Sequence, residues 1–268
     1  MSIETAFGTA TISDNYQLHI ENALLVPWAH RLIEFAGVRV GQVVLDVASG
    51  TGVVARAAAT TVGQRGRVIA NDISALMLAN VAHGFDLDGA PIAVTAGSAT
   101  ELRLPDASVD VVLCQQGLQF IADPDAAVAE MFRVLRPGGV VAIESWAAGA
   151  RLDPLDTYAD ALRTNGVQTR SHRPISNDSV KVTEADVAAA LKSFLDVAVL
   201  TERVPVRWPT VADEVAGIFG TPFGPLVDAL DAERRAAVLE SVRTALGDSH
   251  GDAVEHVTVS VMGRGIRP

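Results

Sequence analysis

The sequence predicts an α/β protein built around a mostly parallel β-sheet that helices cover on both faces. Between residues 43 and 146, short β-branched runs alternate with segments of helical periodicity. Continuous apolar runs of this kind are typical of strands that are buried on both sides. Glycine and proline turns separate the runs from the helical segments, which is the pattern of an α/β domain.

Chain length, net charge and cysteine content limit the number of domains and the kinds of partner and metal site that we expect. A chain of 268 residues can bury one substantial core, so we expect one domain overall. The net charge of -11 makes nucleic acid and membrane surfaces poor partners. Cys114 is the single cysteine, so no internal disulfide and no cysteine-based metal cluster can form, and we expect no metal site. Neither a secretory signal nor a membrane-spanning stretch is recognisable, which predicts a cytoplasmic protein.

Helices are predicted before the first strand. Residues 1–15 show no clear period and are expected to form a tail. Residues 16–37 have helical periodicity, with Pro27 suited to the first turn of a second helix and Gly37 ending it. The apolar residues of one helical face are Leu25, Trp28, Leu32 and Phe35.

Five strands with intervening helices follow. Glycine or proline ends most helices, and Ser74 is a good N-cap for the second of them. In chain order we expect strands at 43–47, 67–72, 92–97, 109–114 and 140–146, with helices at 53–61, 75–83 and 125–135.

After Trp146 the alternation is less regular. We expect a helix over 183–195 that starts with a Thr183–Asp186 capping pair, then a strand over 197–208. Helices near 211–219 and 225–246 and a strand around 257–261 follow. The predicted organisation is lid helices at 1–40, a ligand-binding core at 41–147, and pocket helices with the last strands of the same sheet at 148–268.

The junction between the first strand and its helix is the first candidate site. Asp46 ends the strand, and glycines at 50 and 52 let the backbone approach a ligand closely. In an open parallel sheet, ligands bind beyond the carboxyl ends of the strands. The glycine spacing and Val53 depart from a G-x-G-x-x-G fingerprint, which argues against a pyrophosphate.

Asp72 ends the second strand, 20 residues after Gly52. An acid at this place can accept hydrogen bonds from both ribose hydroxyls of an adenosine-bearing cofactor. Alone, each feature has a structural alternative, because Asp72 could cap a helix and the glycines could serve only a turn.

Four segments taken together are specific. "VLDVASGTG", "ANDIS", "GSATELRLPDASVDVVLCQQGLQF" and "MFRVLRPGGVVAIESW" resemble, in this order, the motifs of class I S-adenosylmethionine-dependent methyltransferases. The nearest group is type 11, which includes the ubiquinone and menaquinone C-methyltransferases. The resemblance covers residues 16–146. It implies a Rossmann-like, doubly wound sheet of seven mostly parallel strands with helices on both faces and a helical lid.

The resemblance also implies a site for S-adenosyl-L-methionine, which leaves as S-adenosyl-L-homocysteine. The backbone of Ala48, Gly50 and Gly52 would cradle the methionine part, and Asp46 would hold the loop and the cofactor's ammonium. Asp72 would bind the ribose. The remaining contacts implied are Ile73 and Met77 on the adenine face, Ser98 and Ala99 at its edge, Gln115 near the ammonium or the methyl group, and Tyr16 on the cofactor.

Two positions depart from the common pattern of the family. Ala48 stands where many members have glycine, which is tolerable if its backbone dihedrals are ordinary. Ser98 replaces the usual aspartate facing the adenine amine, so we expect weaker adenine binding, not its loss.

The function predicted is methyl transfer to a small, hydrophobic acceptor, which could be a natural product, quinone-like or lipid-like. Such a transfer is an in-line displacement that depends on positioning. His19 and His30 are the candidate bases, each without a visible partner in the sequence. The alternatives are a cyclase or a non-methylating cofactor-binding protein on the same fold and, third, an NAD-dependent oxidoreductase. Monomer and homodimer both remain open.

Overall fold

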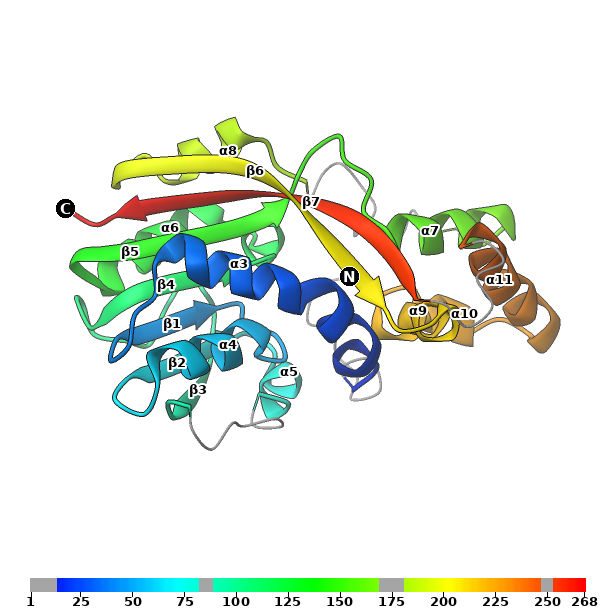
Figure 1. The fold of residues 1–268 in the computed structure, drawn as a ribbon, viewed down its shortest axis with the longest axis horizontal. Helices are drawn as coiled ribbons and strands as arrows, with labels where there is room; N and C mark the ends of the chain where they lie inside the picture. Colours follow the sequence, from blue (N-terminus) through cyan, green and yellow to red (C-terminus); the bar gives the residue numbers. More distant parts are fainter. Residues whose placement is uncertain (1–13, 82–88, 169–180, 247–252) are drawn as a thin grey trace. The chain divides into compact units, whose positions relative to one another are not determined.

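The computed structural model describes residues 14–81, 89–168, 181–246 and 253–268. It confirms an α/β fold with a seven-stranded sheet in the order β3-β2-β1-β4-β5-β7-β6 (Figure 1). The pairs β1–β2, β1–β4, β2–β3 and β4–β5 are parallel, and β7 is antiparallel to β5. The strands are β1 (Val43–Val47), β2 (Arg67–Asp72), β3 (Ile92–Ala96), β4 (Val109–Gln115), β5 (Leu135–Trp146), β6 (Leu195–Trp208) and β7 (Val254–Ile266).

The chain divides into two compact units. The sheet unit comprises Trp28–Ala148, Lys181–Glu202 and Ser260–Pro268. The helical unit comprises Met1–Pro27, Gly149–Val180 and Arg203–Val259. Strands β6 and β7 therefore contribute residues to both units. The three segments predicted from the sequence, with boundaries at 40 and 147, remain a prediction.

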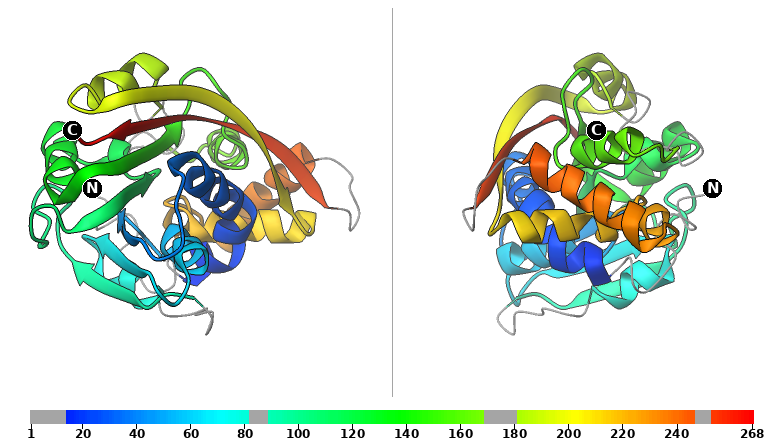
Figure 2. Two further views of the ribbon diagram at one scale, coloured as in Figure 1. Left: turned by 60° about the vertical axis from the view of Figure 1, so that its left-hand side comes forward. Right: turned by 90° about the vertical axis from the view of Figure 1, so that its right-hand side faces the viewer.

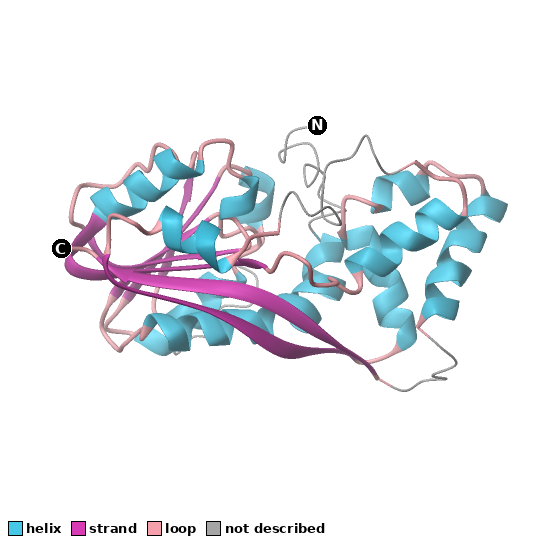
Figure 3. Cartoon of the chain, turned by 90° about the horizontal axis from the view of Figure 1, so that it is seen from above, coloured by secondary structure: helices cyan, strands magenta, loops and turns pink. Residues whose placement is uncertain are grey.

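Helices lie on both faces of the strands of the sheet unit (Figure 3). They are most of α3 (Val26–Ala36), α4 (Val53–Val62), α5 (Ala75–Ala79), η2 (Leu118–Phe120), α6 (Pro124–Val134) and α8 (Glu184–Ala190). The predicted caps are present at two of them. The Ser74 side chain accepts the Met77 N–H at the start of α5, and Thr183 and Asp186 form a capping box on α8.

The core of the sheet unit is the apolar interior of the central strands. Leu45 on β1 and Val111, Val112 and Leu113 on β4 have no exposed surface, as expected for strands covered on both faces. Trp28 of α3 is equally buried and packs edge-on against Trp146, with ring centroids 6.3 Å apart. The tryptophan pair anchors α3 to the end of β5.

The helical unit contains η1 (Gln17–Leu25), α7 (Leu155–Thr164), α9 (Val211–Gly217), η4 (Ile218–Gly220), α10 (Gly224–Asp228) and α11 (Ala232–Ala245), drawn from two sides in Figure 2. Tyr158 of α7 is fully buried, and its hydroxyl donates to the backbone carbonyl of Glu214 on α9. The Trp208 indole donates to the backbone carbonyl of His19 at 2.8 Å. The first bond ties α7 to α9, and the second ties η1 to the end of β6.

Several boundaries differ from the prediction for identifiable reasons. β5 begins at Leu135 instead of 140, because Gly138 and Gly139 exchange backbone hydrogen bonds with Arg267 at 2.9 Å. The helix predicted over 225–246 is interrupted, since Asp231 caps a new helix, α11.

Other differences are changes of length. α8 ends at Ala190, well before the predicted end at Leu195, where β6 begins. The helix after Ser74 ends at Ala79, while the predicted end near residue 83 and the predicted tail, except 14 and 15, lie outside the described residues. α7 was not predicted. No helix of the described ranges is long and apolar enough to cross a membrane.

Candidate functional site

The loop between β1 and α4, residues 48–52, has an unusual backbone. Ala48, Gly50 and Gly52 all have positive φ angles, of 56°, 55° and 91°. A Cβ atom added at Gly50 would meet nothing within 4 Å, so open space adjoins the backbone there. A glycine beside open space allows a ligand to approach the main chain closely, which is what the glycines of this loop led us to expect.

Ala48 corrects one expectation. Its methyl group was expected to be tolerable on the condition of ordinary dihedrals, yet a φ of 56° places it in the left-handed region. For a residue with a Cβ atom this conformation costs on the order of 1 kcal/mol. The Ala48 Cβ also lies 2.6 Å from where a Cβ of Gly117 would be. The loop after β1 is therefore in close contact with the turn after β4.

Asp72 is attached to the same loop. One carboxylate oxygen accepts the Gly50 N–H at 2.8 Å, and the other accepts the Ser74 N–H at 2.8 Å. Burial raises the pKa of Asp72, which the N–H groups of Ser74, Gly50 and Ile73 counteract in part. The two hydrogen bonds of ordinary geometry, from the Gly50 and Ser74 N–H groups, leave about two of the roughly four acceptor positions of the carboxylate for ribose hydroxyls. Asp72 holds the start of α5 through Ser74, and ribose binding stays a prediction.

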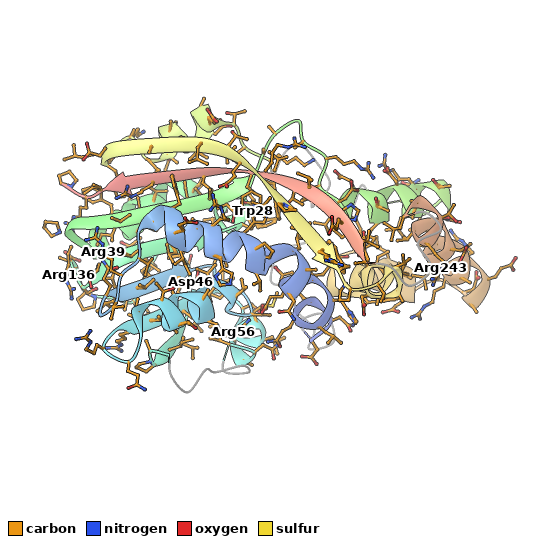
Figure 4. The ribbon with its side chains drawn as sticks, in the orientation of Figure 1. Trp28, Arg39, Asp46, Arg56, Arg136 and Arg243 are labelled. Carbon is orange, nitrogen blue, oxygen red and sulfur yellow. The ribbon has the colours of Figure 1, made fainter. Side chains whose placement is uncertain are left out.

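Asp46, at the end of β1, is a buried acid. It is only 1% exposed, and neither carboxylate oxygen has a hydrogen-bond partner of ordinary geometry among the described residues. Burial raises its pKa well above the usual range. The Ala55 N–H and the charge of Arg56 on α4 lower this pKa, whereas the charge of Asp72 raises it further. Asp46 and Arg56 are labelled in Figure 4. Such an acid has acceptor capacity for a cationic or N–H donor.

The end of β2 presents apolar side chains beside Asp72. Ile73 is 50% exposed, as suits a residue predicted to pack on a ring. Met77 is buried, and Leu76, which sequence reasoning missed, is the second exposed apolar side chain, at 45%. The helical periodicity after Ser74 was the available signal, because adjacent residues of α5 face different sides, with Leu76 exposed and Met77 buried.

The β3 end lies next to β2. The backbone carbonyl of Asp72 accepts the Gly97 N–H at 3.0 Å, which brings Ser98 and Ala99 to the same edge of the sheet. The Ser98 hydroxyl is within 2.8 Å of the Thr100 hydroxyl and also accepts the Thr100 N–H. Ala99 is buried. The structure therefore brings Asp46, Asp72 and the 98–99 segment to one sheet edge.

A buried polar cluster at the ends of β4 and β5 contains the predicted Gln115 together with Gln116 and Glu144, which were missed from the sequence. Gln115 is buried and pairs with Glu144 in the strand register. Glu144 has no exposed surface, and the Gln116 side-chain amide donates to it at 2.8 Å. Burial raises the pKa of Glu144 to about 7, opposed by Ser260, Gln116 and Gln115. A glutamate inside the apolar run "VVAIESW" was the available signal.

The predicted bases, His19 and His30, have no partner among the described residues. His30 is exposed on α3 of the sheet unit, whereas Tyr16 and His19 belong to the helical unit. Neither imidazole has a hydrogen-bond or ion-pair partner within the part of the chain that is described. The histidine with an acidic partner is His256 of the helical unit, whose Nε2 lies 2.7 Å from the Glu214 carboxylate. The two residues are 42 positions apart, so no local pattern announces the pair.

The chain is similar to known methyltransferases. Residues 45–143 match the family model described as "Methyltransferase domain". The ubiquinone/menaquinone biosynthesis C-methyltransferase UbiE of Hydrogenovibrio crunogenus is 38% identical over 114 residues, 42% of this chain and 45% of that protein. The UbiE protein of Psychromonas ingrahamii is 32% identical over 155 residues, 57% of this chain and 61% of its own.

The similarity to solved structures concerns the fold. The phosphoethanolamine N-methyltransferase 2 of Haemonchus contortus, solved with S-adenosyl-L-methionine, is 19% identical with a TM-score of 0.61. The comparison covers 99% of this chain and 59% of that one. The chain spans about half of the length of the curated relatives it matches. Residues 45–143 are thus similar to the methyltransferase domain of these proteins.

Proposed function

We propose that the protein transfers a methyl group from S-adenosyl-L-methionine to a small hydrophobic acceptor. The observation that carries this proposal is the loop 48–52 within the matched domain. Its glycine backbone adjoins open space, and Asp72 at the end of the next strand holds it by the Gly50 N–H. The cofactor has no phosphate groups. A phosphate-binding loop would carry a lysine, and residues 48–52 contain none.

The residues at this edge fit the chemical groups of the cofactor. Asp72 retains acceptor capacity for the two ribose hydroxyls, and Ile73 and Leu76 offer apolar surface for the adenine. Asp46 supplies unused acceptor positions toward the methionine end. Ser98 is already engaged with Thr100, which agrees with weaker adenine recognition than an aspartate would provide. Roles for Met77, Ala99, Gln115 and Tyr16 stay part of the proposal.

The cofactor supplies an electrophilic methyl group on a sulfonium. The protein's part is to hold the acceptor in line with that methyl group and to exclude water. No general base is required when the acceptor is an electron-rich carbon, whereas a hydroxyl acceptor benefits from one. His19 and His30 remain candidates for that second case.

For the acceptor we propose a quinone-like molecule methylated at carbon. Support comes from the names of the relatives, which are C-methyltransferases of ubiquinone and menaquinone biosynthesis. The test incubates the protein with S-adenosyl-L-methionine and panels of quinone-like, phenolic, polyketide-like and lipid-like acceptors, and measures S-adenosylhomocysteine release. Release with quinone-like compounds alone supports this choice. A protein that binds the cofactor but releases none with any acceptor is a cyclase or a binding protein instead.

Replacing Asp72 tests the ribose assignment. We expect Asp72→Ala to weaken S-adenosylhomocysteine binding about 100-fold, because two hydrogen bonds to a charged group are lost at roughly 1.5 kcal/mol each. Calorimetric titration measures this, and a parallel titration with NAD tests the oxidoreductase alternative. Ser74→Ala is the control, since it removes the α5 cap and leaves the carboxylate in place. Unchanged affinity of Asp72→Ala would contradict the ribose assignment.

Replacing Gly50 tests the cradle. Gly50→Val should abolish binding, because the side chain would fill the open space beside the loop. Gly63 is a matched control at the other end of α4, since it also has positive φ and open space around its Cβ position. Gly63→Val should lower the thermal stability and leave the affinity within about twofold of wild type. Equal losses of affinity in both variants would show that backbone strain, not occupation of the cradle, is responsible.

A further inference from the structure

The polar cluster behind the proposed site is built around one glutamine. The Gln116 side-chain nitrogen donates to the Glu144 carboxylate at 2.8 Å and to the Ser260 hydroxyl at 3.3 Å. Its side-chain oxygen accepts the Trp146 N–H at 3.0 Å and the Gln119 amide at 2.8 Å. Both ends of the side chain are therefore fully engaged, which is the condition under which a buried polar group is stabilising.

Gln116 needs this support because of its backbone. Its φ is 52°, in the left-handed region that a residue with a Cβ atom rarely adopts. Its N–H donates to the backbone carbonyl of Glu144 at 2.8 Å, so Glu144 holds it by main chain and side chain together. A strained conformation persists only where the surroundings enforce it. Glu144 is the one ionisable side chain that contacts Gln116 within the described residues.

The turn that Gln116 starts touches the loop after β1. A Cβ at Gly117 would lie 2.6 Å from the Ala48 Cβ and 3.6 Å from the Val47 carbonyl oxygen, so the two backbones are packed without spare room. Ala48 is itself in the left-handed region and begins the 48–52 loop. A displacement of Gln116 would therefore shift or loosen that loop.

We propose that Glu144 is a positioning residue for the cofactor: through Gln116 it fixes the turn after β4 against the 48–52 loop and so keeps that loop in its binding conformation. The inference rests on the proposed function, since it assigns Glu144 a task in the same cofactor site. The effect of Glu144 on the loop passes through Gln116 and Gly117, and its carboxylate also accepts a hydrogen bond from Gln115, a contact that the Q116A variant leaves in place.

The test is a double-mutant cycle on S-adenosylhomocysteine affinity. We expect E144A and Q116A each to weaken binding about tenfold, and the double variant to be no weaker than either one, because both interrupt the same path. E144Q should stay within about threefold of wild type, since its amide oxygen can still accept from Gln116. The calorimetric titration is done at a temperature at which melting curves show every variant folded.

Asp110 provides the matched control. Glu144 connects β5 to the turn after β4, and the Asp110 carboxylate connects β4 to β1 by accepting the Val43 N–H at 2.7 Å, at the opposite ends of these strands. D110A should lower the melting temperature and leave the affinity unchanged, whereas E144A should change both. If E144A does not fold, Q116A carries the same test, because Glu144 remains in place there.

The outcomes separate the two proposals. Wild-type affinity in both E144A and Q116A, or losses that add up in the double variant, would overturn the positioning role and leave the proposed function standing. A wild-type protein that does not bind S-adenosylhomocysteine would overturn the proposed function, and this inference with it. Tenfold losses that do not add up, with rescue in E144Q, support the positioning role.

Discussion

Two buried carboxyl groups, one in each unit, differ in the partners they are given. Glu144 of the sheet unit and Glu214 of the helical unit are both 0% exposed, and each has one oxygen without a partner of ordinary geometry in the described chain. Glu144 is surrounded by neutral amides and a hydroxyl, whereas the Glu214 carboxylate lies 2.7 Å from His256. The comparison teaches that equally buried carboxyl groups can be held by different kinds of partner, neutral donors in one cluster and an imidazole in the other.

The two clusters should respond to pH through different groups. In the sheet unit the carboxyl group itself titrates, since burial raises the pKa of Glu144 to about 7. In the helical unit the imidazole titrates. Burial lowers the pKa of His256, but the hydrogen bond and charge of Glu214 outweigh this and raise it above its usual value. The following experiments test that contrast.

Removing His256 should have the largest effect. His256→Ala leaves Glu214 buried without a cation, which we expect to cost about 3 kcal/mol of unfolding free energy. Because the pKa of His256 is higher in the folded state, the His256–Glu214 pair stabilises the folded protein fully below the unfolded pKa of 6.5. This stabilisation is lost as the pH rises through the folded pKa. Urea unfolding at about pH 5.5 and about pH 9 should therefore show a smaller difference at the higher pH. His256→Gln can still donate a hydrogen bond, so it should lose less unfolding free energy than His256→Ala. If the difference between His256→Ala and wild type did not depend on pH, the two clusters would not differ in the way described.

Glu144→Gln should have the next largest effect, and it concerns stability alone. The folded pKa of about 7 lies above the ordinary 4.5, so protonated Glu144 favours the folded state and stability is lost as pH rises through this interval. The unfolding free energy of Glu144→Gln relative to wild type should rise by about 2 kcal/mol from about pH 5 to about pH 8. The same pair of measurements on Asp110→Asn controls for titration elsewhere, and a flat difference would show that Glu144 titrates normally.

The smallest effects on stability are expected from substitutions of two glycines, one next to each cluster. Gly117→Ala would press on Ala48, and Gly217→Ala would press on the Tyr158 hydroxyl, each with a Cβ at 2.6 Å. We expect each to cost about 1–2 kcal/mol of unfolding free energy. Beyond its effect in the wild-type background, Ala48→Gly should recover part of the first loss and Tyr158→Phe part of the second, while the crossed pairs should show only additive effects. Thermal unfolding of the four double variants measures this, and recovery in a crossed pair would refute the assigned contacts.

Much of the sheet unit could be predicted because its determinants are local. The β-branched run at 43–47, the Ser74 cap and the Thr183–Asp186 capping box depend on residues within a few positions of each other, and the structure confirms all three. The order of motifs also predicted the seven-stranded fold and the methyltransferase domain, which the comparisons confirm. The site residues carried over from the resemblance remain predictions, although Asp46, Gly50 and Asp72 lie at one edge of the sheet.

By itself, then, the sequence determined the strands, most helix starts and the place of the candidate site, because periodicity, caps and glycines act over short distances along the chain. Only the tertiary structure decided that Ala48 is left-handed, that Gln116 is held by Glu144 28 residues later, and that Glu214 meets His256. These contacts join strands and helices whose separation in sequence carries no signal. Their energies come from burial and hydrogen bonding, which exist only once the elements have packed.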